Sequence, residues 1–180
     1  MDGEKLADPL AGATGGLEGP SRQALAYPFP WPEGPCVLVS GRLFRLKEFV
    51  VGDPLRSQVA GHGPLCDLLD SLGFKRQAGL GFTTLLASGS NGAPGRLWAK
   101  LDGRVRLPIA FFLPGVIRDL VSVYSCHFAS YGAVPATVCR YPGARARLIA
   151  LVVPDEAVPV IHASEAVGRN YGYFQLATGG

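Results

Sequence analysis

The residues best suited to chemistry are a polar turn and a carboxylate far from it in the sequence. The apolar run Phe82–Leu86 leads directly into the segment Ala-Ser-Gly-Ser-Asn-Gly at positions 87–92. A turn of this kind between a strand and a helix presents backbone N–H groups, which can hold an anion without a charged side chain. The residues expected to bind a substrate carboxylate are Ser88, Gly89, Ser90 and Asn91. Taken alone, these residues are also ordinary turn formers.

Glu165 is the candidate catalytic residue. It follows an apolar segment that we expect to be helical, and Tyr171 lies shortly after it as a candidate binding residue. A carboxyl group in this position can carry a proton as a general acid or base. A lone glutamate near a helix end is otherwise a solvated terminal residue. Together, the turn and Glu165 suggest a pocket that binds a carboxylate and moves a proton.

Other nucleophiles and metal ligands fit less well. His162 shares a helix face with Glu165, but no third ligand has a recognisable spacing, so we expect no metal site. Packing, or a contact that positions Glu165, explains His162 better. Cys126 and His127 are neighbours on an expected strand and point to opposite faces, so they cannot form a dyad. A hydrolase that uses Ser90 or Cys126 lacks a placed base.

Composition favours one domain that acts on a small anion. The 180 residues are 48% hydrophobic and 17% charged, with a formal net charge of +3. The cations are scattered, which argues against a nucleic-acid interface, and the densest patch of arginines, at 140, 145 and 147, is interpreted as a solvated strand face. The four cysteines show no C-x-x-C spacing and no secretory signal precedes them, so a cytoplasmic protein with reduced thiols is expected. No apolar stretch approaches the ~20 residues that span a bilayer, so no membrane association is expected.

The pattern along the chain predicts an α+β fold with a mostly antiparallel or barrel-like sheet. Residues 1–26 are predicted to be a disordered Gly/Pro-rich tail, and 27–180 a single domain. Helices are expected from Leu65 to Leu72, after Pro94, and from Asp155, as a cap, to about Glu165. The expected strands cover residues 36–39, 42–46, 82–86, 109–112, 120–124, 134–138, 147–153 and 171–176.

The order of these motifs resembles the gamma-glutamylcyclotransferase-like superfamily. The resemblance covers about residues 80–176 and leaves 27–80 as an N-terminal extension. It rests on short motifs in the family's order: Leu86-Ala87-Ser88-Gly89-Ser90-Asn91, Leu97-x-x-Lys100, Tyr131-Gly132-Ala133-Val134-Pro135-Ala136, Pro142-Gly143, the strand Ala146 to Val153, and Ser164-Glu165 with Tyr171.

The resemblance implies a small mixed, mostly antiparallel β-barrel with short flanking helices. It implies conversion of a gamma-glutamyl amide, or a related amino-acyl amide, to 5-oxoproline and a free amine, without metal or cofactor. Glu165 matches the family's acid/base residue, and the backbone of residues 89–91 would hold the substrate carboxylate or the developing oxyanion. The expected partner is a small anionic substrate derived from an amino acid; the oligomeric state stays open.

The sequence departs from the family at two positions. Ser88 stands where the family has a tyrosine at the head of the turn, and Ala166 replaces the glycine that follows the catalytic glutamate. These departures leave open a non-catalytic binding or assembly module on the same scaffold. In that alternative, the proline-spaced segment Phe29–Pro32 covers the pocket or docks a partner.

Overall fold

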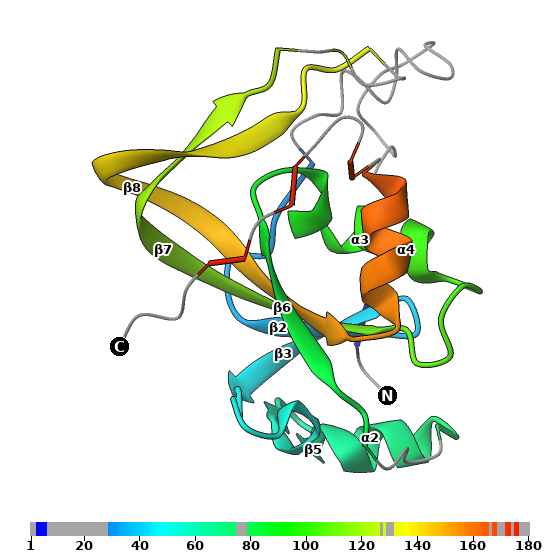
Figure 1. Cartoon of the computed structure of the whole chain (residues 1–180). Helices are drawn as coiled ribbons and strands as arrows, with labels where there is room; N and C mark the ends of the chain where they lie inside the picture. The colour runs from blue at the N-terminus through cyan, green and yellow to red at the C-terminus, as the bar shows by residue number, and fades with distance from the viewer. Residues whose placement is uncertain are drawn as a thin grey trace, which may run out of the picture.

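One antiparallel sheet organises the molecule. The computed structural model describes residues 3–6, 29–74, 79–126, 128, 132–165, 167–168, 172–173 and 175–176. Its strands are β1 (Glu4–Lys5), β2 (Cys36–Val39), β3 (Arg42–Glu48), β4 (Gln58–Val59), β5 (Gly63–Pro64), β6 (Phe82–Ala87), β7 (Ile109–Tyr124) and β8 (Ala136–Pro154). They follow the order β5-β4-β3-β2-β7-β8-β6, with β1 paired to β3 (Figure 1). The predicted α+β class with an antiparallel sheet is confirmed.

The sheet is an open path, so the predicted barrel closure is not observed. Within the described residues the path ends at β5 on one side and at β6 on the other, and no ladder joins them. The segment 27–80, which the family resemblance left unexplained, contributes β2 to β5, and β2 pairs directly with β7. The extension therefore belongs to the same sheet.

The predicted N-terminal tail is only partly described. Glu4 and Lys5 pair with Leu43 and Arg42 of β3, so the predicted disorder does not extend to residues 3–6. The rest of segment 1–26 lies outside the described residues. At the other end, the expected strand 171–176 is also only partly described, and residues 172–173 and 175–176 have no regular secondary structure.

The β2–β3 hairpin forms where turn chemistry predicts it. Ser40 and Gly41 both have positive φ, 47° and 71°, as a tight two-residue hairpin turn of the primed type requires. A side chain at Gly41 would also meet Trp98, whose Cε2 lies 3.1 Å from the position of an added Cβ. Gly41 therefore permits both the turn and its close approach to the neighbouring helix.

β7 and β8 form a long bent ribbon instead of the four short strands that the sequence predicts. They pair from Phe111↔Val152 out to Tyr124↔Ala136, with one irregularity next to Asp119. Asp119 has φ 60° and accepts a hydrogen bond through Oδ1 from the Gly143 N–H at 2.7 Å. Residues 141–144 bulge at this corner, so β8 continues past Pro142-Gly143 without a hairpin.

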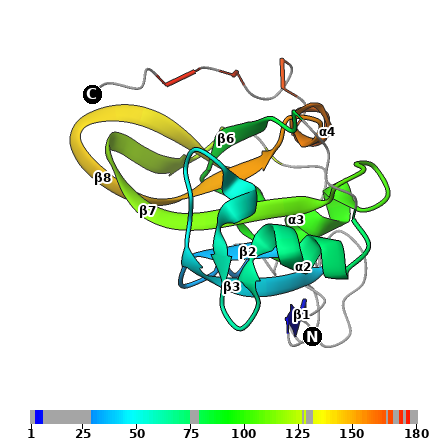
Figure 2. The same cartoon turned by 90° about the horizontal axis from the view of Figure 1, so that it is seen from below.

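The strands bury opposite side chains in two apolar clusters, one on each face of the sheet. Leu38 and Phe112 belong to the cluster that contacts the helices α3 (Pro94–Leu101) and α4 (Ala157–Ser164). Val37 and Phe111 belong to the cluster under α2 (Leu65–Ser71). Figure 2 shows α4 and α2 on different sides of the curved strands. Alternate residues of each strand point to opposite faces, which is why one sheet can hold two cores.

The three α-helices lie where apolar spacing predicts them, but one predicted cap is wrong. Pro94 occupies the first turn of α3, where its missing N–H costs nothing. Asp155 does not cap α4 with its side chain. Its Oδ1 accepts a hydrogen bond from Thr83 Oγ1 at 2.7 Å instead, and Glu156 holds the N-cap position. Asp155 therefore ties the start of α4 to β6.

None of the helices in the described part of the chain has the length and apolar character that a bilayer crossing requires. The four cysteines are thiols, as expected: Cys36 is buried, Cys66 is partly buried, and Cys126 and Cys139 are exposed. Burial raises the pKa of Cys36 to about 12.

Candidate functional site

The C-terminal end of α4 positions Glu165. Ile161 is 2% exposed and anchors the helix in the core. Its carbonyl oxygen accepts hydrogen bonds from the Ser164 Oγ, at 2.7 Å, and from the Glu165 N–H, at 3.1 Å. The last turn is thereby fixed, and the Glu165 side chain leaves it toward α3 with 27% of its surface exposed.

Helix α3 supplies Lys100 opposite Glu165. Leu97 and Leu101 are fully buried, which fixes the rotation of this short helix against the sheet. Lys100, between them in sequence, has a side chain only 15% exposed. Its aliphatic stem is therefore largely covered while the ammonium group reaches polar partners.

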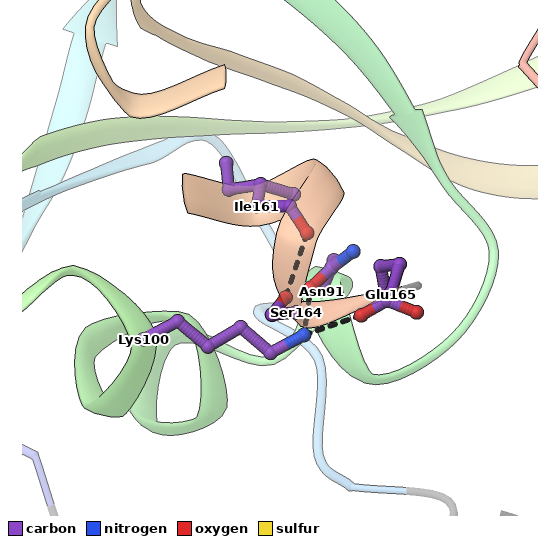
Figure 3. Close-up of polar contacts among 5 residues, drawn as sticks. All are labelled: Asn91, Lys100, Ile161, Ser164 and Glu165. Carbon is purple, nitrogen blue, oxygen red and sulfur yellow. Dashed lines mark hydrogen bonds and ion pairs between the residues drawn. The ribbon is translucent and has the colours of Figure 1, made fainter. Parts of the chain in front are cut away.

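Lys100 joins the two halves of the predicted site. Its Nζ donates hydrogen bonds to Asn91 Oδ1, at 2.7 Å, and to Glu165 Oε1, with which it also forms an ion pair (Figure 3). The three side chains come from the 88–91 turn, α3 and the end of α4. Lys100 therefore holds the Glu165 side chain beside the 88–91 turn.

The predicted anion-binding turn is a short 3₁₀ segment, η2 (Ser90–Gly92). Two bonds close it: the Gly92 N–H donates to Gly89 O at 3.0 Å, and the Ala93 N–H donates to Ser90 O at 3.1 Å. The N–H groups of Ser90 and Asn91 precede the first donor of the turn, the Gly92 N–H, and have no partner inside the turn. The predicted anion-binding role requires these two N–H groups to have no partner inside the turn.

The proline-spaced segment Phe29–Pro32, which we call the strap, lies against this turn. The Trp31 indole Nε1 donates to Gly89 O at 3.1 Å. A Cβ added at Gly92 would lie 2.6 Å from Trp31 Cε2, so only glycine fits beneath the ring. Phe29 is 3% exposed, and the Arg96 guanidinium lies 4.7 Å above its ring. The strap is therefore fixed both on the turn and on α3.

Two other predicted contributors, Ser88 and His162, are not joined to this cluster by their side chains. Ser88 is half-buried, and no hydrogen bond of its side chain is found within the described residues. Tyr171 lies outside the described residues. The His162 ring contacts the Tyr173 ring, with centroids 4.8 Å apart and ring planes tilted by 55°. Only its backbone carbonyl contacts Glu165, accepting from the Glu165 N–H at 3.2 Å.

Metal binding finds no support in the described ranges, where no group of three or more His, Cys, Asp or Glu side chains could hold an ion. The residue that sequence reasoning missed is Lys100, which served only as part of a motif. The sequence feature that could have indicated its role is its position three residues after Leu97 and one before Leu101, two leucines of the core. That position requires the ammonium to find a partner at the edge of the core.

We compared the chain with protein families, with curated proteins and with solved structures, and none of the three comparisons found a match. The function proposed below therefore rests on the sequence motifs and on the geometry of Asn91, Lys100 and Glu165.

Proposed function

We propose that this chain catalyses intramolecular aminolysis of a gamma-glutamyl or related amino-acyl amide, releasing 5-oxoproline and a free amine. The observation that carries the proposal is the bridge through Lys100 between Asn91 and Glu165. The sequence motifs predicted that the turn and the carboxylate act together. Their contact through one ammonium group supports that prediction. The family's small barrel is part of the proposal, although the sheet formed by the described residues is open.

The proposed reaction needs one group that both accepts and returns a proton. The substrate's own amine attacks its gamma-carbonyl carbon, a new N–C bond closes the five-membered ring, and the bond to the leaving nitrogen breaks. The Glu165 carboxylate takes a proton from the attacking amine and returns it to the leaving nitrogen. Holding the substrate curled makes the attack effectively intramolecular, which lowers the barrier by several kcal/mol.

The other residues have supporting roles in this mechanism. The N–H groups of Ser90 and Asn91 face the substrate carboxylate or the oxyanion. Lys100 positions the Glu165 carboxylate against the turn. Because Lys100 is paired with Glu165, the attacking amine must share the carboxylate with Lys100, and the second carboxylate oxygen is the one available to it.

The test compares two glutamates on one helix. Glu165→Gln removes the proton acceptor at the end of α4, and Glu156→Gln changes an ion-paired glutamate of similar exposure, 23%, at its start. Each purified chain is incubated with a panel of gamma-glutamyl amides, and 5-oxoproline is measured by chromatography. We expect E165Q to lose turnover by at least a hundredfold and E156Q to retain it. Equal turnover in E165Q and the parent chain refutes the mechanism.

A second candidate, a non-catalytic binding or assembly module, is favoured by one contact. Trp31 lies on the turn and binds Gly89 O, as that alternative predicts for a segment covering the site. In this case the Lys100–Glu165 ion pair stabilises the fold and has no role in catalysis. The distinguishing result is 5-oxoproline release by the parent chain: its absence with every amide, in a folded protein whose Trp31→Ala variant also shows none, favours the module.

A further inference from the structure

The cross-strand register of the β7–β8 ribbon gathers arginines that are scattered in the sequence. Arg118 lies directly opposite Arg145, and Val116 directly opposite Arg147. Directly opposed residues share a face of the sheet, and so do residues two apart on one strand. Arg118, Arg145 and Arg147 therefore lie on the same face of the ribbon, which we call the arginine face.

The arginine face is exposed, although nearer the core the same face of β8 carries Ile149 and Leu151, which pack in the cluster that contacts α3 and α4. Ala146 and Leu148, which alternate with the arginines on β8, are 8% and 2% exposed. The three arginines themselves are exposed. Figure 1 shows the β7–β8 ribbon extending beyond the helices.

This positive charge is not neutralised by the rest of the described chain. Like charges directly opposite on paired strands are destabilising, and no carboxylate in the described ranges lies within ion-pair distance of Arg118 or Arg145. The nearest acid in sequence, Asp119, uses Oδ1 to hold the Gly143 N–H. Among the described residues, Arg147 donates a hydrogen bond to a backbone carbonyl, Glu33 O, at 3.4 Å. An external anion would offset the repulsion.

Exposed aromatic rings accompany the arginines. Of the seven large hydrophobic side chains exposed in the described residues, four lie on this ribbon or its end loop: Val116, Tyr124, Phe128 and Tyr141. Tyr141 is 65% exposed and lies at the ribbon's corner, between Arg140 and Arg145 in sequence. Three of the four are rings that can stack, and only one is aliphatic.

We propose that the arginine face binds single-stranded nucleic acid. The planar guanidinium groups suit phosphate oxygens, and Arg145 and Arg147 stand about 6.6 Å apart along the strand, so they can contact successive phosphates. Tyr141 stacks on a base, as aromatic residues beside basic grooves do in proteins that bind single strands. An acidic peptide would use the arginines but would leave the exposed rings without a role.

The test measures binding of a fluorescein-labelled oligouridine to the full chain by anisotropy, over a series of NaCl concentrations. Three phosphate contacts predict a slope of log Kobs against log salt of about −2. We expect the variant R118Q/R145Q/R147Q to bind at least tenfold more weakly, with a slope close to zero. We expect Tyr141→Ala to bind about tenfold more weakly with the slope unchanged, because base stacking does not release counterions.

The matched control, R45Q/K47Q/R56Q, removes three exposed cations elsewhere on β3 and just before β4 and is expected to bind as the parent chain does. Arg118→Glu is the control for loss of binding through misfolding, because it replaces the like-charged pair Arg118–Arg145 with a pair of opposite charges. It is expected to melt at or above the parent temperature and yet to lose binding. Equal losses in the control and the triple variant overturn the proposal. So do unchanged binding by R118E, equal affinity for polyglutamate, and binding of phosphatidylserine vesicles without binding of oligouridine.

Discussion

Replacing Lys100 by methionine removes the ammonium group that joins Asn91 to Glu165 while keeping most of the apolar stem. The contribution of the Lys100–Glu165 ion pair to stability lies between two limits. Exposed ion pairs contribute about 0.2–1 kcal/mol, whereas breaking a buried one costs about 3–5 kcal/mol. With side chains 15% and 27% exposed, we expect Lys100→Met to lower the free energy of unfolding by about 1–2 kcal/mol. In a chain of this size that is a fall in Tm of about 3–6 °C.

A double-mutant cycle separates the coupling energy between Lys100 and Glu165 from the packing energy that each substitution also removes. Urea unfolding of Lys100→Met, Glu165→Met and the double variant gives the coupling energy, which we expect to be about 1 kcal/mol or more. The Arg106–Glu156 pair supplies the comparison. Glu156 is the N-cap residue of the same helix, α4, and the Arg106 side chain is 78% exposed. Its coupling is expected to be smaller because water screens it. A Lys100–Glu165 coupling near zero, or below that of Arg106–Glu156, refutes the claim that Lys100 holds the site together.

The remaining predictions concern the strap, the thiols and acid stability. Gly92→Ala should lower stability by about 1–3 kcal/mol by displacing Trp31, whereas Gly115→Ala, with open space at its Cβ, should change unfolding in urea far less. A thiol reagent at pH 8 should label Cys139 rapidly and Cys36 only after denaturation, because burial raises the pKa of Cys36 to about 12; rapid native labelling of Cys36 would contradict its burial. Burial acts to raise the pKa of Glu156, but its bonds from the Leu107 N–H and from Arg106 outweigh burial and lower that pKa. The stability gained is therefore present above the unfolded value of 4.5 and lost as the pH falls below it, so Glu156→Gln should flatten the acid limb of the Tm–pH curve.

Local signals predicted the local structure. The hairpin at Ser40-Gly41 and the helix beginning at Pro94 depend on nearest neighbours, and both formed as predicted. The continuous β7 was missed because Pro114 interrupts its pattern. β2 pairs with β7 at residues 109–112, and beyond that point β8 is the only neighbour of β7 among the described residues. Proline is tolerated there because its missing N–H can face the unpaired side.

Long-range partners were harder to infer. The motif order predicted that the turn and Glu165 act together, but nothing local showed that a lysine would join them. The arginines of the β7–β8 ribbon are a second case in which local sequence did not indicate the spatial neighbours. Arg118 and Arg145 look scattered in sequence, and only the strand register, which runs unbroken from Phe111↔Val152 to Arg118↔Arg145, brings them face to face.

The most direct test of the proposed function is 5-oxoproline release by the parent chain, Glu165→Gln and Glu156→Gln, measured on the same gamma-glutamyl amides after each variant is shown to be folded. We predict turnover by the parent and by E156Q, and at least a hundredfold less by E165Q. Parent-level release by folded E165Q would contradict the role assigned to the carboxylate, and no release by any of the three chains would contradict the activity itself.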